Sequence, residues 1–545
     1  MPDLSDDPRA ILARGAGRGI TVEEFGPVWT SARLRLSRAG WQAATLEPFL
    51  DLAVPYTSTS SGRLSDDAAR IALAARPGAP GLRILELGAG SGIFARLFLN
   101  ALQRRAPDVY ARSHYVVTDG SPSILDAQRA QGVLDGHAAI VSHQVLDSGS
   151  DWTAPGPFDV VLCSYLLDSL AFDLLAICDT QVWRREVRAV LPETRLDDAA
   201  ALRAALSAAD DAALPPLAHL GPLLGLHTRH VPLTRAEVPL PHTLPSDTGG
   251  ETVPWVQCWG ALSCIDRAIR HLAPGGVMIF SDYGHLSPHA SYDSPELQGF
   301  GQSVAVGLNF PQMATALRDV AGLRFHAPAE EDGHLYTRVV QNGDGPDLAP
   351  LVDEVFGALR HRALTAPIDA AREVIRGRMF ESARGFYAKA LHLQPQNWYL
   401  MQEIALLLLL PNGEHGAALD MAGIGLSLNP LAPDLWRAQG EALAGLGRDT
   451  EATAALDRAV ALAPGNVAAH LARARIALRQ RDPGQALAGI ALALTHDHDG
   501  DAREALLALQ DQTLGLIAQV ARERLQASVN AVMPQDGLPR PDHAT

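Results

Sequence analysis

Residues 84–92 read Ile-Leu-Glu-Leu-Gly-Ala-Gly-Ser-Gly, an apolar run that ends in three closely spaced glycines. The run predicts a strand over Arg83–Leu87, and the glycines predict a tight turn into a helix from Ile93 to Arg104. Such a turn lets a ligand approach the backbone with no side chain in the way. The segment therefore predicts the first strand and the ligand-binding turn of an open parallel sheet.

The position of the third glycine distinguishes two kinds of nucleotide-binding sheet. The dinucleotide fingerprint GxGxxG would require glycine at position 93, where this chain has Ile93. The observed pattern is ExGxGxG, with Glu86 at the end of the strand. A carboxylate repels a pyrophosphate but tolerates the ammonium and sulfonium of S-adenosylmethionine. We therefore expect S-adenosyl-L-methionine as the cofactor, bound by Glu86, Gly88, Ala89, Gly90 and Gly92.

Polar residues that follow the later strands extend this expected cofactor site. Asp119, followed by Gly120, comes after the second strand and can accept hydrogen bonds from both ribose hydroxyls. Asp147 is placed to accept from the adenine amino group, with a helix N-cap beside Ser148 as the competing interpretation. Ser164 ends the fourth strand and completes the expected set.

Between Arg83 and about Gln341, short apolar runs alternate with helical stretches, as in a parallel sheet flanked by helices. The expected strands are Arg83–Leu87, His114–Thr118, Ala139–Leu146, Phe158–Ser164, Gly276–Ser281, Leu323–His326 and Leu335–Val340. The stretch 171–255, rich in Ala, Leu and Pro, is interpreted as an insertion between the fourth and fifth strands. The predicted fold class is α/β, with a Rossmann-like class I methyltransferase sheet in a domain over residues 76–345.

Residues 1–75 are expected to form a helical N-terminal extension or lid. From Thr21 onward, apolar side chains recur at spacings near three and four. They are Phe25, Val28, Trp29, Leu34, Leu36, Trp41, Leu46, Phe49 and Leu50.

A repeat begins downstream of about Leu364. Pro395, Pro430 and Pro464 lie 35 and 34 residues apart, close to the tetratricopeptide period, and small residues recur in phase around them. The period predicts an all-α tetratricopeptide solenoid over residues 364–500, with an unrelated alanine-rich helical bundle as the alternative. A capping helix is expected at 501–529 and a disordered tail at 530–545.

Composition restricts the partners. The net charge of −16 disfavours nucleic acid, because an acidic surface repels phosphates. The four cysteines, scattered through the chain, have neither zinc-site spacing nor a disulfide framework, so we expect no metal and a reducing, cytoplasmic environment. The longest apolar run, Ile404–Pro411, is far shorter than a bilayer span, so no membrane attachment is expected. Stacked repeats commonly bind a peptide or protein, and dimerisation is the structural alternative.

Methyl transfer is an in-line displacement, so the protein must exclude water, align the acceptor and manage one proton. Asp168 and Asp282 are expected to orient an acceptor nitrogen or hydroxyl and take its proton, with Tyr283 and Tyr165 positioning it. Each aspartate could instead cap a helix or hydrogen-bond a loop. His285 is an alternative base.

The region from about residue 45 to 341 resembles the MidA-like methyltransferases, a family that includes a mitochondrial complex I assembly factor that methylates a protein arginine. Besides the glycine motif, residues 166–170 are similar to the family's N-E-x-x-D-A-L-P, residues 282–284 to its D-Y-G, and residues 308–310 to its V-D-F. The chain has Ser164 and Tyr165 where the family has N-E. A tyrosine supplies no carboxylate to orient a guanidinium, so the resemblance stops short of arginine as the acceptor.

The combined motifs predict an S-adenosylmethionine-dependent methyltransferase that acts on a peptide or protein substrate recruited by the tetratricopeptide module, with a nitrogen as the acceptor. A small-molecule or natural-product methyltransferase is one alternative. A catalytically silent tetratricopeptide scaffold is the other.

Overall fold

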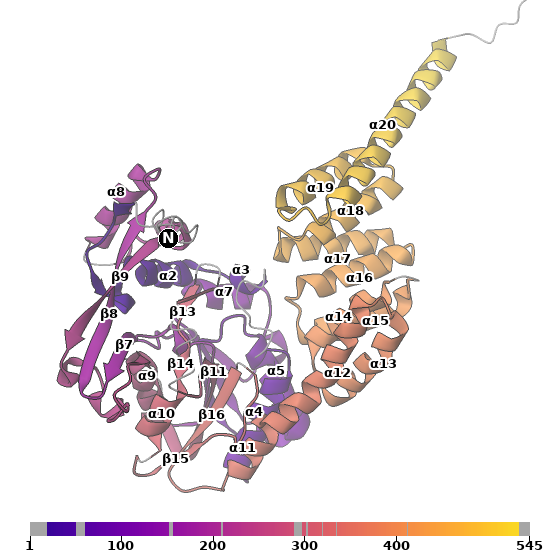
Figure 1. Ribbon diagram of the computed structural model, residues 1–545. Coiled ribbons are helices and arrows are strands. Elements are labelled where there is room, and N and C mark those ends of the chain that lie inside the picture. The colour runs from indigo at the N-terminus through magenta and orange to yellow at the C-terminus, as the bar shows by residue number, and fades with distance from the viewer. Residues whose placement is uncertain are drawn as a thin grey trace, which may run out of the picture. The chain divides into compact units, whose positions relative to one another are not determined.

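The computed structural model describes residues 19–50, 60–151, 156–208, 211–287, 297–300, 303–318, 320–333, 335–410 and 413–532. Contacts divide the chain into two compact units, Met1–Tyr399 and Leu400–Thr545. Figure 1 labels many of the helices and strands of both. Residues 1–18 of the expected N-terminal extension and residues 533–545 of the expected tail lie outside the described part.

The central sheet of the first unit has the strand order β15-β16-β11-β6-β3-β4-β5, with β14 beside β11. The pairs from β5 to β11 are parallel, whereas β15 and β16 are antiparallel. The strands are β3 (Arg83–Leu87), β4 (His114–Asp119), β5 (Val141–Val145), β6 (Phe158–Ser164), β11 (Leu272–His285), β14 (Leu308–Asn309), β15 (Leu323–His326) and β16 (Leu335–Asn342). These strands confirm the α/β fold class and the expected sheet, although β11 begins four residues earlier than expected.

The strand order reverses beside β3. The chain adds β4 and β5 on one side of β3 and then crosses to β6 and β11 on the other. Open parallel sheets bind ligands at the carboxyl ends of the strands where this reversal occurs. The central parallel strands β3, β4, β6 and β11 are mainly apolar because helices cover both faces of such a sheet; Leu85, Phe158 and Phe280 are fully buried. The helices packed around it include α4 (Arg63–Ala75), α5 (Ile93–Arg105), α7 (Pro122–Ala130), α9 (Trp259–Arg270) and α10 (Phe310–Leu317).

The segment between β6 and β11 builds a second, antiparallel sheet. Its strands are β7 (Asp173–Cys178), β8 (Gln181–Leu191), β9 (Gly225–Leu233) and β10 (Val253–Gln257), and it also carries α8 (Leu196–Leu206). A small core that includes Ile177, Val182 and Trp255 lies on this sheet. The interpreted insertion is therefore a folded layer with its own packing.

The expectation of helix from Thr21 onward is wrong for residues 21–27, and residues 28–30 form a single 3-10 turn. Short strands β1 (Ile20–Thr21) and β2 (Gly26–Pro27) pair with β8, and α2 (Ala32–Ala43) begins only after Ser31. Pro27 disfavours helical backbone at the residue before it, which explains why an apolar pattern of helical spacing does not form helix there. A short helix, α3 (Glu47–Leu50), follows α2.

From Ala349 onward, the described chain is helical. In the first unit α11 (Ala349–Phe356) leads into the packed pair α12 (Ala358–Arg376) and α13 (Phe380–Leu393), and α14 (Trp398–Leu408) begins at the end of that unit. The second unit continues with α15 (His415–Leu428), α16 (Pro433–Gly445), α17 (Asp449–Leu462), α18 (Val467–Arg479), α19 (Pro483–His496) and α20 (Arg503–Val532).

Consecutive helices of the second unit pack in pairs, and α20 packs against α19 and α18. Fully buried alanines such as Ala438, Ala452 and Ala459 let the paired helices approach closely. Paired helices with small residues at their contacts are the arrangement expected of a tetratricopeptide region. In the described part of the chain, no helix is long and apolar enough to cross a membrane.

Asn309, within the V-D-F-like motif, joins β14 to α10. Its Oδ1 accepts from the backbone N–H of Gln312 at 3.1 Å, and its Nδ2 donates to the carbonyl of Val256 at 3.1 Å. The Gln312 side chain in turn accepts from the N–H of Cys258 at 2.9 Å. Asn309 is 5% exposed, so these hydrogen bonds are shielded from water. The residue therefore links β14 and α10 to β10.

Replacement of Asn309 by alanine is expected to lower the free energy of unfolding by about 2–3 kcal/mol, because it removes a helix cap and leaves the Val256 carbonyl without its side-chain donor. Urea unfolding followed by circular dichroism measures the loss. Asp482→Ala is the matched control: Asp482 caps α19 through a similar bond to the N–H of Gln485, 3.0 Å long, at a less buried site. The control is expected to lose about 1 kcal/mol. Equal losses would contradict the additional role of Asn309.

Candidate active site

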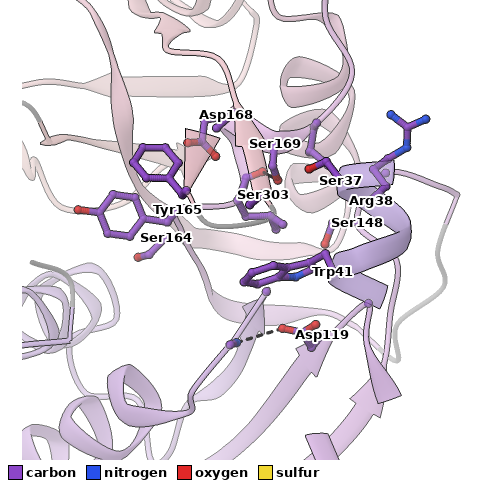
Figure 2. A pocket seen from close by; sticks show the side chains of 18 of the residues that line it. Ser37, Arg38, Trp41, Asp119, Ser148, Ser164, Tyr165, Asp168, Ser169 and Ser303 are labelled. Carbon is purple, nitrogen blue, oxygen red and sulfur yellow. Dashed lines mark hydrogen bonds between the residues drawn. The ribbon is translucent and has the colours of Figure 1, made fainter. Parts of the chain in front are cut away.

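A cavity of about 410 Å³ lies at the carboxyl ends of β3, β4, β6 and β11. Its walls also include α2 and a short hairpin of β12 (Gln298–Phe300) and β13 (Ser303–Ala305). Figure 2 shows the side chains that project into it. Cavities of about 300–1,000 Å³ typically hold one small molecule, and this one is near the lower end of that range.

The glycine turn after β3 forms one wall. Gly88, Gly90 and Gly92 have φ values of 65°, 53° and 75°, in the left-handed region that favours glycine. The N–H of Gly90 donates to Asp119 Oδ2 at 3.0 Å, which ties the turn to the end of β4 (Figure 2). Gly88, Ala89 and Gly90 line the cavity, whereas Gly92 caps α5 behind them.

Two buried acids lie beside this turn. Glu86, 4% exposed, accepts a hydrogen bond from the Tyr115 hydroxyl at 3.0 Å, and burial raises its pKa to about 8. Asp119, 3% exposed, accepts from the N–H of Ser121 through Oδ1 at 2.9 Å, and burial raises its pKa as well. Both residues line the cavity, so buried negative charge can form where the expected cofactor is positive.

Asp147 and Gly120 also line the cavity, Asp147 from an exposed position. Asp147 Oδ1 accepts from the N–H of Gly149 at 2.9 Å. The residues that directly follow form a turn and no helix, so the alternative of a helix N-cap beside Ser148 is wrong.

Asp168 and Asp282 lie together, but only Asp168 lines the cavity. Asp282 is fully buried, and its Oδ2 accepts from the N–H groups of Leu167 at 2.9 Å and Asp168 at 3.2 Å. Burial raises the pKa of Asp168 to about 7, and burial together with the charge of Asp168 raises the pKa of Asp282 well above its ordinary value. Two buried carboxyls this close resist double ionisation, so the pair retains a proton near neutral pH.

Aromatic rings form the wall beside Asp168. The centroids of Tyr165 and Tyr283 are 4.7 Å apart, and Tyr283 stacks on Phe300 at 5.9 Å. The backbone of Tyr165 has φ 52°, a strained conformation for a bulky residue, and its N–H donates to the carbonyl of Ser281 at 3.0 Å. This conformation places the ring against the cavity (Figure 2).

Helix α2 supplies a wall that the motifs did not indicate. Ser37 and Trp41 project from it toward the cavity, as Figure 2 shows, and Arg38 also lines the cavity. The helix is held on two sides: Ser37 Oγ accepts from the N–H of Val304 at 2.8 Å, and Ser121 Oγ donates to the carbonyl of Gln42 at 3.0 Å. In the sequence, the tryptophans of the N-terminal segment indicate that α2 is partly buried. Their spacing does not indicate which part of the protein they pack against.

Most of the expected site residues line one cavity: Glu86, Gly88, Ala89, Gly90, Asp119, Gly120, Asp147, Ser164, Tyr165, Asp168 and Tyr283. Gly92, Asp282 and His285 lie outside the lining. Lining residues that the sequence motifs did not indicate include Ser37, Arg38, Trp41, Ser148, Ser169, Phe300 and Ser303. Among the described residues, no group of three or more His, Cys, Asp or Glu side chains could hold a metal ion.

The cavity fits a cationic nucleoside cofactor. Its glycine turn presents bare backbone, its volume suits a single ligand, and its acids offer acceptors for hydroxyl and ammonium groups. Sheet, turn and acids together define the class of the protein, an S-adenosylmethionine-dependent methyltransferase. Residues 70–308 match the family model described as "Putative S-adenosyl-L-methionine-dependent methyltransferase", and residues 433–476 match a tetratricopeptide-repeat model. The chain is therefore an S-adenosylmethionine-dependent methyltransferase with a tetratricopeptide module.

Several solved structures are similar to parts of the chain. An uncharacterized superfamily protein of Burkholderia thailandensis is 18% identical, with 64% of this chain and 93% of that chain covered and a TM-score of 0.40. A member of the same superfamily from that organism, bound to S-adenosyl-homocysteine, is 18% identical, covers 62% and 91%, and has a TM-score of 0.37. A tetratricopeptide protein of Thermus thermophilus is 18% identical, covers 31% and 100%, and has a TM-score of 0.26. No curated protein matches the chain.

The raised pKa of Glu86 has a measurable effect on stability. Between the ordinary pKa of 4.5 and about 8, the folded chain keeps a proton that the unfolded chain releases. The contribution of Glu86 to stability therefore falls as the pH rises through this range. Glu86→Gln keeps an acceptor for Tyr115 and has no proton to lose, so its thermal midpoint is expected to rise relative to wild type between about pH 5 and 8. Glu251→Gln, at an exposed loop position, is the control. If the thermal midpoints of Glu86→Gln and wild type change with pH in parallel, the raised pKa of Glu86 is contradicted.

Proposed function

We propose that this methyltransferase modifies a nitrogen on a peptide or protein that its tetratricopeptide module recruits in the cytoplasm. The size of the cavity carries the proposal. About 410 Å³ is enough for one small ligand and leaves little space for a second whole molecule beside the cofactor. An acceptor presented on a side chain needs only to reach through the opening. Repeat solenoids characteristically offer extended surfaces for such a larger substrate.

Within this proposal, the cofactor-binding residues are those at the ends of β3, β4 and β6. Glu86 faces the ammonium, the Asp119 oxygens retain acceptor capacity for the ribose hydroxyls beyond their backbone bonds, and Asp147 reaches the adenine amino group. Gly88, Ala89, Gly90, Gly120 and Ser164 form the surface against which the cofactor packs, and Gly92 shapes the turn. When bound, S-adenosylmethionine supplies a methyl group on a cationic sulfonium.

Asp168 is the proposed proton acceptor. Bound S-adenosylmethionine would supply the methyl group, and the proton that the acceptor nitrogen loses on methylation would pass to the Asp168 carboxylate. Asp282 is a positioning residue, because it holds the amides of Leu167 and Asp168. The rings of Tyr165 and Tyr283 align the acceptor and exclude water.

Replacement of Asp168 by asparagine is expected to lower kcat by about 10²–10⁴-fold, because the proton loses its acceptor, while S-adenosylhomocysteine binds with little change. Because burial raises the pKa of Asp168 to about 7, wild-type turnover is expected to increase as the pH rises through about 7, and the variant should lack this limb. Single-turnover rates from pH 5.5 to 9 measure both effects. A variant that retains the wild-type pH profile would contradict the role of Asp168 as base.

The class of acceptor is tested with the full-length protein, S-adenosylmethionine labelled in its methyl group, and lysate from cells that lack this gene. We expect label in material retained by a filter of about 3 kDa, lost on protease treatment, and absent with Gly90→Asp, which adds a charged side chain at a left-handed glycine. Label confined to the filtrate would favour the small-molecule methyltransferase. Unlabelled lysate together with normal partner capture by Gly90→Asp would favour the silent scaffold.

A further inference from the structure

Trp398, the first residue of α14, is bonded to a wall of the cavity. Its side chain is buried, with 1% of its surface exposed. The indole Nε1–H donates a hydrogen bond to the backbone carbonyl of Ser60. Ser60 lines the same cavity as Glu86 and Asp119. The residue that begins α14 thus contacts the cavity wall within the first unit.

A second contact holds the same two segments together. Gly62 has φ +101°, and a Cβ at this position would lie 2.2 Å from the carbonyl oxygen of Gln396. A residue with a side chain fits neither the backbone conformation nor the space. Residues 60–62 and 396–398 are therefore joined by one polar and one close-packed contact.

A buried ion cluster fixes the helices that precede α14. Asp67 of α4 has 1% of its side chain exposed and accepts from Arg360 of α12 at 3.0 Å. Arg63 and Arg70 lie 3.9 Å and 3.7 Å from the same carboxylate. Arg360 thus bonds α12 to a carboxylate of α4 that is almost fully buried. The ion pair between α4 and α12 thus helps to hold residues 396–398 close to Ser60.

We propose that Trp398 is a positioning residue of the cofactor cavity, which sets the place of Ser60 and couples the start of α14 to cofactor binding. The inference rests on the cavity being the cofactor site. Coupling of this kind is reciprocal. If cofactor binding favours the conformation in which Trp398 is bonded to Ser60, a partner that stabilises the start of α14 in this conformation increases cofactor affinity. The cofactor increases the affinity for that partner by the same factor.

The test uses the full-length chain and S-adenosylhomocysteine as the probe. Trp398→Phe keeps an aromatic ring but removes the donor, and its Kd by calorimetry is expected to be about three- to tenfold weaker, as for the loss of one hydrogen bond. Trp436→Phe is the matched control. Trp436 donates through Nε1 to the carbonyl of Pro430 at 2.8 Å in the second unit and does not line the cavity, so its Kd should stay within about twofold of wild type.

Hydrogen exchange provides a readout that a merely structural role would not change. Saturating S-adenosylhomocysteine is expected to slow exchange of the α14 amides in wild type and in Trp436→Phe, but not in Trp398→Phe. Gly62→Ala, which disturbs the same contact from the other side, should weaken binding in the same direction. If Trp398→Phe does not fold, Gly62→Ala and the wild-type exchange experiment decide the question.

The outcomes separate the inference from the cofactor site. If wild type and Trp398→Phe bind the probe equally tightly, the coupling is overturned and the cofactor site stands. The same conclusion follows if the probe binds wild type without slowing exchange in α14. Wild type that does not bind the probe overturns the cofactor site and the coupling together.

Discussion

The carboxylate of Asp119 is the interaction on which the site depends. One oxygen holds the N–H of Gly90 and the other holds the N–H of Ser121, so a single buried group joins the turns that follow two neighbouring strands. The neighbouring Ser121 hydroxyl then bonds to the end of α2, which forms another wall. The chain has therefore buried negative charge at the edge of its sheet. Such charge is costly without compensation, and backbone donors and a cationic ligand are the available forms of compensation.

Asp282 is a second buried carboxylate that fixes a turn of the site. The carboxylate of Asp282 accepts hydrogen bonds from the backbone amides of Leu167, Asp168 and Tyr283, and these bonds fix the turn from which Asp168 reaches the cavity. One aspartate thus shapes the site and the other faces it. Their shared proton links the two roles, because a change in the charge of either carboxyl alters the field at the other.

The central sheet could be predicted because buried parallel strands leave a plain signal: continuous apolar runs such as β3 and β6, each bounded by turn residues. The glycine turn and Asp119 were predictable because their chemistry is local. The two-residue strands β1 and β2 were not, because their pairing with β8 depends on residues more than 150 positions away and leaves no periodicity. Sequence position placed Asp168 and Asp282 alike at strand ends, and only the fold shows which carboxyl faces the cavity. The contact of Trp398 with Ser60 is equally invisible in sequence, since it spans 338 residues.

The left-handed backbone of Tyr165 limits which substitutions evolution can make at this position of the cavity. Most side chains at that position would retain the strain, and glycine, which would relieve it, would remove the ring that lines the cavity. A change of acceptor through this position is therefore also a change in fold stability. Lineages that alter it must carry enough surplus stability elsewhere, which makes the well-packed central sheet a precondition for new specificity.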